Sequence, residues 1–463
     1  MTCFVRSLRA SGMPGAILAV VVAAIATGLA DRADAQAPST TTGSGFASSR
    51  SPQPAVPPAP GGAAVLTFEQ ALAHALERSP AILAASSGRE LAMAQLRRAR
   101  AWENPTLEIE AENVLGQGAY ADFGSAETTV SLSQPLPLGG SRAAGVRGAR
   151  AGEAWAAAEV EVARRHVRRD VAIAYADAIA AERIAAIERE RARIGAETRA
   201  AVEKRFAAGL ESALQRARVE VETSGLQAAA RRATAESLSR RRALGALWRA
   251  DAVTEPLDND WFDAMEAAGA PAERDSTRRV DAGAGGAAAV AQEHPRLRSA
   301  DLAVGRARAA LEAARAQRFH GLEARVGTRR FADQPGGSDQ AFVIGVAMPL
   351  PLWDRNEAGI AEARAALSAA EVEAERVRRD LDGERADAAA DYEAAAMEAG
   401  ALATRGLPAA QSAARLAQQG YEAGRLSLFD RLEAERALSD VRERLEGARR
   451  VLRRAGAVLE SLQ

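Results

Sequence analysis

The chain repeats itself, and this internal duplication limits its fold more than any other feature. Three short motifs recur after 215 positions and a fourth after 214: Ser79-Pro80 and His294-Pro295, Leu107-Glu108 and Leu322-Glu323, Phe206 to Gly209 and Tyr421 to Gly424, Pro135 to Leu138 and Pro349 to Leu352. A constant spacing over this distance indicates one structural unit present twice. We expect the copies at about 65–250 and 290–463, joined at 251–289 by an Asp/Gly/Ala-rich linker with short local structure.

Each copy has the same internal order. A helix comes first (68–101 and 295–317), then a hairpin, then a long helical pair with a tight turn in it. The four hairpin strands are expected at about 105–115, 127–136, 321–331 and 340–349. Their apolar and polar side chains alternate, as in Leu107-Glu108-Ile109-Glu110-Ala111. This pattern is what a transmembrane barrel strand requires, although an ordinary half-buried sheet also shows it. The polar turns at 116–126 and 332–339 are typical of outward-facing barrel loops.

The helices that follow the hairpins are unusually long. No proline occurs between Pro137 and Pro256, and a helix from Arg142 to Arg205 would measure about 100 Å. Gly406-Leu407-Pro408 should interrupt the penultimate helix, because proline removes a backbone donor. In the last helix, apolar residues step alternately by three and four, which predicts a coiled-coil seam: Leu438, Val441, Leu445, Ala448, Leu452, Ala455, Leu459 and Leu462.

The first 35 residues have the pattern of a cleaved export signal. Arg6 and Arg9 supply its positive region, 16–25 is a short apolar stretch, and Ala33-Asp34-Ala35 is a cleavage site. Residues 36–64 are rich in Pro, Ser, Thr, Gly and Ala and should be a disordered lead-in. The single cysteine, Cys3, lies inside the signal, so we expect a mature chain with no disulfide and no lipidated cysteine.

No later segment is apolar over the ~20 residues that a membrane helix needs. A mature chain that sits in a membrane would therefore do so as a β-barrel. Four strands cannot close such a barrel, so membrane strands demand an oligomer; three chains would supply twelve strands. The expected fold class is mainly α with a β-barrel portion: an internally duplicated chain with long coiled-coil helices and four strands.

Other function classes find little support in the sequence. The net charge of -1 gives no reason to expect a nucleic-acid partner. No catalytic triad, zinc motif or phosphate-binding Gly-rich loop is present, which argues against an enzyme and against a cofactor. The four histidines are scattered without metal-ligand spacing, so we expect no dedicated metal site.

The order of the motifs resembles a known family. The run Asn104-Pro105-Thr106-Leu107, Gly116, Glu127-Thr128-Thr129 and the segment 131–140 (SLSQPLPLGG) look like TolC-type outer-membrane efflux proteins, closest to their heavy-metal, CzcC-like and CusC-like branch. In the second copy, 349–356 (PLPLWDRN) and Tyr421-x-x-Gly424 match as well. The resemblance covers about 65–463.

The resemblance implies a homotrimer with a twelve-stranded outer-membrane barrel and a twelve-helix periplasmic tunnel. It also implies a periplasmic adaptor protein and an inner-membrane pump of the resistance-nodulation-division (RND) type as partners. The substrate would be exported passively through the duct, with heavy-metal cations favoured by the branch. Many relatives carry a lipidated cysteine, and this chain departs from that pattern.

Three groups of residues are candidates for function. The turns at Gly209-Leu210 and Gly424-Arg425 should lie at the periplasmic tips, where the resemblance implies adaptor contact. Tyr421, Asp430 and Glu433 match positions where relatives place a gate with an acidic ring. Glu108, Glu110 and Glu112 share one face of a strand and should face the lumen, where they attract cations or only keep the pore wet.

Two other readings remain open. The chain can be a duct for organic toxicants or secreted polypeptides rather than for metals. It can also be a periplasmic coiled-coil adaptor or structural protein, which explains the signal and the helices but not two alternating hairpins at one offset.

Overall fold

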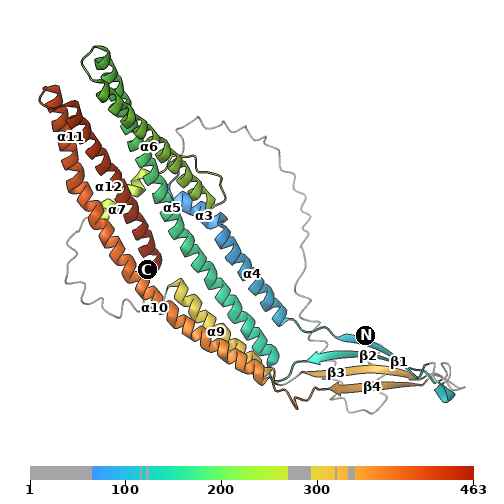
Figure 1. Cartoon of the computed structure of the whole chain (residues 1–463). Helices are drawn as coiled ribbons and strands as arrows, with labels where there is room; N and C mark the ends of the chain where they lie inside the picture. The colour runs from blue at the N-terminus through green and yellow to red at the C-terminus, as the bar shows by residue number, and fades with distance from the viewer. Residues whose placement is uncertain (1–64, 115–116, 121–124, 270–293, 319–320, 332–338) are drawn as a thin grey trace, which may run out of the picture.

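The computed structural model describes residues 65–114, 117–120, 125–269, 294–318, 321–331 and 339–463. The expected signal, the lead-in, part of the first hairpin loop, most of the second and part of the linker lie outside these residues. The chain forms long helices with a small sheet at one end (Figure 1). The helices are α3 (Phe68–Arg78), α4 (Pro80–Arg100), α5 (Ser141–Ala207), α6 (Ala213–Ala246), α7 (Asn259–Gly269), α9 (Pro295–Ala316), α10 (Glu357–Ala401), α11 (Leu407–Glu422) and α12 (Leu428–Leu462).

The four expected strands form one antiparallel sheet. They are β1 (Thr106–Glu112), β2 (Glu127–Leu136), β3 (Leu322–Phe331) and β4 (Gln340–Ala347), in the order β1-β2-β3-β4. The two hairpins, one from each copy, join through β2 and β3, where Leu136 lies opposite Leu322. The sheet therefore has two edges, β1 and β4, within a single chain.

The helix expected at 68–101 is two helices, so this prediction was wrong in one respect. Ser79 has an extended backbone, with φ −60° and ψ 130°, and Pro80 starts α4. Proline disfavours the helical conformation of the residue before it, which explains the break. The second copy repeats the arrangement, because His294 is extended (φ −65°, ψ 129°) and Pro295 starts α9.

The main hydrophobic core lies beside the middle of α5. Leu66, α3, α7 and the end of α6 pack there around Tyr175, which is fully buried. The Tyr175 hydroxyl donates to the carbonyl of Leu66 (2.6 Å) and accepts from the backbone N–H of Asp258 (2.8 Å). Burial raises the pKa of Tyr175 to about 12. The segment after 250 is thus more than a linker, since Leu257 and α7 complete this core.

The long helices pack through small side chains. α5 measures about 100 Å at 67 residues. Alanines dominate its buried face, and the helices approach closely at Gly195, where an added Cβ would lie 2.7 Å from Leu226 Cδ1 and the leucine side chain would have to shift. The seam of α12 is confirmed, because its residues are buried or half-buried, with Ala448 and Leu452 packed on α10.

The expected interruption before Pro408 is confirmed. A π-helical turn (Leu402–Gly406) separates α10 from α11. Such turns insert a residue into the helical ladder and appear where a helix must accommodate a local irregularity, here the missing N–H of proline.

Candidate functional site

The sheet has one apolar and one polar face, as the alternation predicted. Leu107, Ile109, Phe342, Ile344 and Val346 lie on the apolar face and are all more than 60% exposed. An exposed apolar face of this size is unusual for a protein in water. β2 and β3 have ten residues each, the length that a tilted strand needs to cross a bilayer.

The polar face carries charges of both signs. Arg325 on β3 forms an ion pair with Glu108 on β1 (2.9 Å), and Arg329 pairs with Glu112 (3.1 Å) and Glu127 (3.0 Å). These long side chains span β2, whose small residues on this face lie buried beneath them: Thr129, Ser131 and Ser133. Two of the three expected lumen-facing glutamates are therefore paired, which the sequence analysis did not anticipate. Glu110 lies on the same face and is exposed.

At the opposite end, two helical turns close the hairpins α5–α6 and α11–α12 (Figure 1). Gly209 and Gly424 have positive φ angles of 73° and 66°. Both turns end the preceding helix with the same two hydrogen bonds. The N–H of the glycine donates to the backbone carbonyl three residues earlier (2.9 Å). The N–H of the next residue donates to the backbone carbonyl five residues before itself (2.8 Å). Leu210 and Arg425 follow the glycines and are exposed. The tight-turn prediction is confirmed for both tips.

Each tip also carries an aromatic ring under an arginine. The Arg216 guanidinium lies 5.0 Å from the centre of the Phe206 ring, and Arg431 lies 5.6 Å from Tyr421. Both pairs are related by the 215-residue repeat. The two arginines were not among the predicted site residues, although the 215-residue repeat relates their positions.

Asp430 is the third residue of helix α12 and completes a capping box with the N-cap residue Ser427. Its carboxylate accepts from the backbone N–H (2.8 Å) and hydroxyl (2.7 Å) of Ser427, and its own N–H donates to the Ser427 hydroxyl (3.2 Å). The hydroxyl hydrogen bond, and then the backbone one, lower the pKa of Asp430. In the first copy, Ser212 caps α6 by accepting from the N–H of Gln215 (3.2 Å). Gln215 occupies the position equivalent to Asp430, so only the second copy has a carboxylate at this position. Glu433 is exposed one turn further along.

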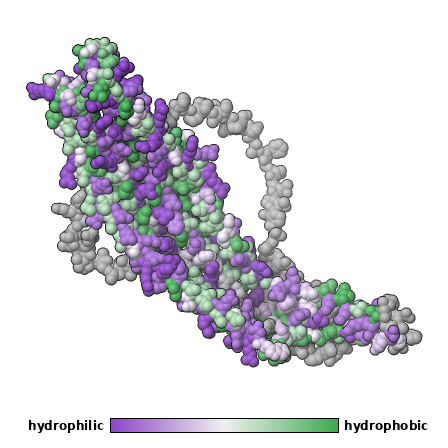
Figure 2. Space-filling model, viewed as in Figure 1, coloured by the Kyte–Doolittle hydropathy of each residue, from purple (hydrophilic) through white to green (hydrophobic). Residues whose placement is uncertain are grey.

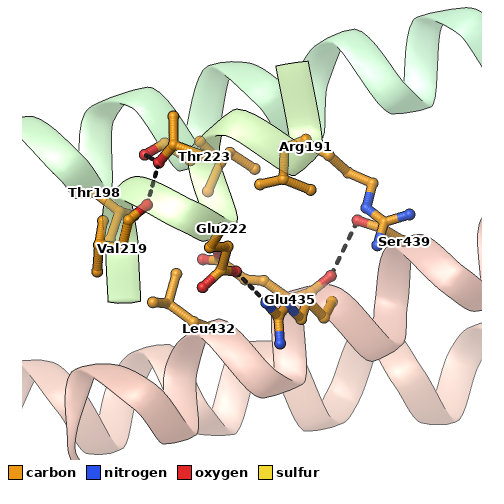
Figure 3. A pocket seen from close by; sticks show the side chains of 12 residues that line it. Arg191, Thr198, Val219, Glu222, Thr223, Leu432, Glu435 and Ser439 are labelled. Atoms are coloured by element: carbon orange, nitrogen blue, oxygen red, sulfur yellow. Dashed lines mark hydrogen bonds and ion pairs between the residues drawn. The ribbon is translucent and has the colours of Figure 1, made fainter. Parts of the chain in front are cut away.

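Below the tips, arginines join the two hairpins. Arg191 on α5 pairs with Glu188 (2.8 Å) and with Asp440 on α12 (3.0 Å). Arg436 on α12 pairs with Glu222 on α6 at 2.5 Å, and Figure 3 shows Glu222 turned toward α12. The cavity between these groups is about 30 Å³, room for about one water rather than a ligand. The sequence alone did not single out these residues.

His294, one of the scattered histidines, has a structural role. Its Nδ1 accepts from the backbone N–H of Arg296 (3.2 Å) and caps α9, while Nε2 lies 3.1 Å from the carbonyl oxygen of Ser461. Within the described ranges, no group of three or more His, Cys, Asp or Glu side chains is arranged to hold a metal ion. The same residues include no helix both long and apolar enough to cross a bilayer.

Known proteins match this chain in two segments that correspond to the two copies of the repeat. The family described as outer membrane efflux protein matches residues 71–248 and 287–462. The cobalt-zinc-cadmium resistance protein CzcC of Cupriavidus metallidurans is 26% identical over 384 residues, 82% of this chain and 86% of that protein. The nickel-cobalt-cadmium resistance protein NccC of Alcaligenes xylosoxydans xylosoxydans is 28% identical and covers 68% of each chain.

Solved structures share the fold. CusC superimposes with a TM-score of 0.68 at 19% identity, over 86% of this chain and 92% of that one. A membrane protein from Pseudomonas aeruginosa gives a TM-score of 0.66 at 21% identity, over 89% and 99%. VceC from Vibrio cholerae gives 0.63 at 18% identity, over 85% and 95%.

Proposed function

This chain belongs to the outer membrane efflux protein family, and on that premise we propose that it is the outer-membrane duct of a tripartite pump that exports heavy-metal cations. The observation that carries the proposal is the two-faced sheet at one end of the long helices. Its exposed apolar face fits hydrocarbon, and its charged face fits a water-filled pore. The helices then extend into the periplasm as a tunnel wall.

The open edges of the sheet support a homotrimer. β1 and β4 each present unpaired backbone groups, and in lipid each such group costs several kcal/mol. Joining β4 of one copy to β1 of the next removes the edges, and three copies give a twelve-stranded barrel. The same assembly gathers the long helices around one axis.

The partners follow from the position of the tips. In this arrangement the turns at Gly209-Leu210 and Gly424-Arg425 lie furthest from the membrane, and we assign them to contact with a periplasmic adaptor. An RND-type inner-membrane pump supplies the energy. Tyr421, Asp430 and Glu433 form the gate at the narrow end, where three copies of the acidic pair concentrate a negative field. The chain itself needs no cofactor.

Metal cations are the favoured substrate because the curated relatives are named for resistance to cobalt, zinc, cadmium and nickel. No metal-binding cluster is found among the described residues, so we assign the choice of ion to the pump. Organic toxicants and polypeptides are the alternative substrates.

The proposal is tested by growth of a deletion strain on Zn²⁺, Co²⁺, Cd²⁺, Ni²⁺, Cu⁺ and Ag⁺, with dyes, detergents and antibiotics alongside. We expect hypersensitivity to metals that the intact gene reverses. Sensitivity to organic compounds alone would overturn the metal assignment and leave the duct.

Two neighbouring variants test the membrane orientation of the sheet. Ile344→Arg puts a charge on the apolar face, which costs about 2–4 kcal/mol near the bilayer midplane, and should abolish rescue. Val343→Arg puts the same charge on the polar face and should retain it. Equal rescue by both would contradict the proposed barrel.

A further inference from the structure

All four strands meet the helices at one end of the sheet, which we call the junction. The register places Thr106 of β1, Leu136 of β2, Leu322 of β3 and Ala347 of β4 near this end. In Figure 1 the ends of α4, α5, α9 and α10 converge on it. If the sheet spans the membrane with the helices in the periplasm, the junction lies at the periplasmic leaflet. The inference below therefore rests on the proposed function.

A hollow of about 1070 Å³ with polar and apolar lining residues opens at the junction. Arg98 lines it from the last turn of α4, Arg142 from the first turn of α5, and Asn356 from the start of α10. The Arg142 guanidinium donates to the carbonyl of Arg100 (2.5 Å) and lies 4.8 Å from the Trp102 ring centre. Its Nε is buried and has no hydrogen-bond partner among the described residues. The hollow thus holds a guanidinium that these contacts fix in place.

The junction carries an excess of positive charge. Its acids are Glu103, Glu312, Glu323, Asp354 and Glu357, of which Glu312 pairs with Arg147 and Asp354 accepts from the N–H of Asn356. The arginines outnumber them, eight to five: Arg97, Arg98, Arg100, Arg142, Arg147, Arg315, Arg318 and Arg355. Most of them are exposed, and no described carboxylate pairs with Arg98 or Arg355.

Exposed apolar residues border this charge on the side of the sheet. Trp353 is 94% exposed and Trp102 is 52% exposed, and Leu350 and Leu352 next to Trp353 are both 62% exposed. Tryptophan is enriched at the level of lipid headgroups, because its ring is apolar and its N–H remains hydrated. The apolar face of the sheet begins directly beyond, at Leu107 and Val346. Figure 2 shows apolar (green) and polar (purple) residues mixed over the sheet end of the molecule.

We propose that the junction binds the headgroup of an anionic phospholipid of the periplasmic leaflet, with Arg98 and Arg142 holding its phosphate in the hollow. The acyl chains lie along the apolar face of the sheet, and Trp102 and Trp353 lie at the boundary between headgroup and chains. Arginine suits phosphate because its planar donors bind two oxygens at once. A free phosphate would use the arginines but would leave the tryptophans and leucines in water, so the surface favours a lipid.

The experiment measures lipid selection by the full-length protein in mixed micelles with equal amounts of phosphatidylglycerol and phosphatidylcholine. Co-purified lipids are quantified after gel filtration. We expect the native protein to enrich phosphatidylglycerol, and Arg98→Gln with Arg142→Gln to lower that enrichment about tenfold. The matched control, Arg231→Gln with Arg232→Gln on exposed α6, removes the same charge and should leave it unchanged. Equal retention of the two lipids, or an equal loss in both double variants, would overturn the proposal.

A second measurement does not depend on altering the hollow. Trp353 is so exposed that Trp353→Phe should fold like the native protein. The fluorescence of the native protein minus that of this variant is therefore the signal of Trp353 alone, and it reports the surroundings of that ring. Phosphatidylglycerol with brominated acyl chains should quench this difference signal more than brominated phosphatidylcholine does. Equal quenching by the two lipids contradicts the proposal. Displacement of phosphatidylglycerol by inorganic phosphate would also contradict it, because the site would then be one for free anions.

Two further measurements distinguish a wrong lipid site from a wrong assignment of the protein as an outer-membrane duct. A protein that alkaline carbonate extracts from membranes, and that forms no ion-conducting channel in planar bilayers, sinks the proposed function and the lipid site with it. A protein that resists extraction and conducts, but retains both lipids equally, sinks the lipid site alone.

Discussion

Arg325 of β3 reaches across β2 to Glu108 of β1, with Nη2 and Oε2 2.9 Å apart. The two residues belong to different copies of the repeat, and the serines of β2 lie buried between them. The polar face of the sheet therefore carries arginine–glutamate ion pairs between strands rather than a row of unpaired carboxylates. This arrangement decides what the glutamates do to a passing ion.

Removing the positive partner should make the pore more selective for cations. In Arg325→Gln the Glu108 carboxylate is no longer neutralised, so its field attracts cations more strongly. Glu110→Gln should shift selectivity the other way. The measurement is the reversal potential in planar bilayers under a salt gradient. Shifts of the same sign in both variants would show that this face does not line the ion path.

The proposed gate residues Asp430 and Glu433 should limit the current through the closed channel. Asp430→Asn with Glu433→Gln should raise the current through the closed channel, because the acidic ring loses its charge. The N-cap residue Ser427 is unchanged, and the amide oxygen of asparagine can still accept from its N–H, so the start of α12 should stay folded. Planar-bilayer recordings check this, with Gln215→Asn at the equivalent place in the first copy as the control. A closed-state current equal to that of the native protein would count against a gate role.

The two tip glycines should resist substitution. Gly209→Ala and Gly424→Ala place a Cβ in the left-handed region, which costs roughly 1–2 kcal/mol each. Gly225 is the control, since it lies within α6 with open space around it, and Gly225→Ala should stabilise by roughly 0.5–1 kcal/mol. Urea midpoints of the purified protein measure both effects. A tip variant as stable as native would mean that the turn adopts another conformation.

Arg453 holds the short helix α7 to α12. It is 8% exposed, donates through Nε to the carbonyl of Phe262 (2.8 Å), and also donates to the carbonyl of Trp261. Burial lowers the pKa of Arg453 to about 10. Arg453→Ala removes both hydrogen bonds of this charged donor, at about 1.5–3 kcal/mol each. Exposed Arg444→Ala should change the unfolding free energy by less than about 0.5 kcal/mol. Similar midpoints for the two variants would show that α7 adds little to stability.

Because His294 is buried, we expect the free energy of unfolding to fall in mild acid. Burial lowers its pKa from 6.5, the hydrogen bond to Ser461 acts against this, and Arg165, Arg385 and Arg296 act with burial. Above pH 6.5 the ring is neutral in both states and its contribution is complete. Below pH 6.5 the unfolded chain takes up a proton that the folded chain resists, so stability falls until the lowered pKa is reached.

The test is His294→Asn, which keeps a capping side chain and removes the titrating ring. We expect a smaller drop in melting temperature below pH 6.5 than for the native protein. His166, whose pKa burial also lowers, should supply the remaining dependence. His74→Asn alters an exposed histidine and serves as the control. A pH profile identical to the native one would remove His294 as its source.

Much of the architecture follows from short-range patterns. The alternation around Leu107 and Phe342 determined the strands and their two faces, because side chains on a strand point to opposite sides with a period of two. Gly209 and Gly424 marked the turns, since glycine accepts positive φ at no steric cost. The family resemblance added the trimer, the adaptor and the pump, which no residue pattern in one chain specifies.

Other features depended on the tertiary structure. The break at Ser79 had a local cause in Pro80, but the structure showed that it separates two helices. The pairings of Arg325 with Glu108 and of Arg191 with Asp440 join residues more than 200 positions apart, and the region after 250 completes the core through Leu257. The sequence by itself determined which segments form helices and strands and which faces are apolar, because these depend on neighbours a few residues away. Only the tertiary structure decided which charges meet, because that depends on the register in which distant elements pack.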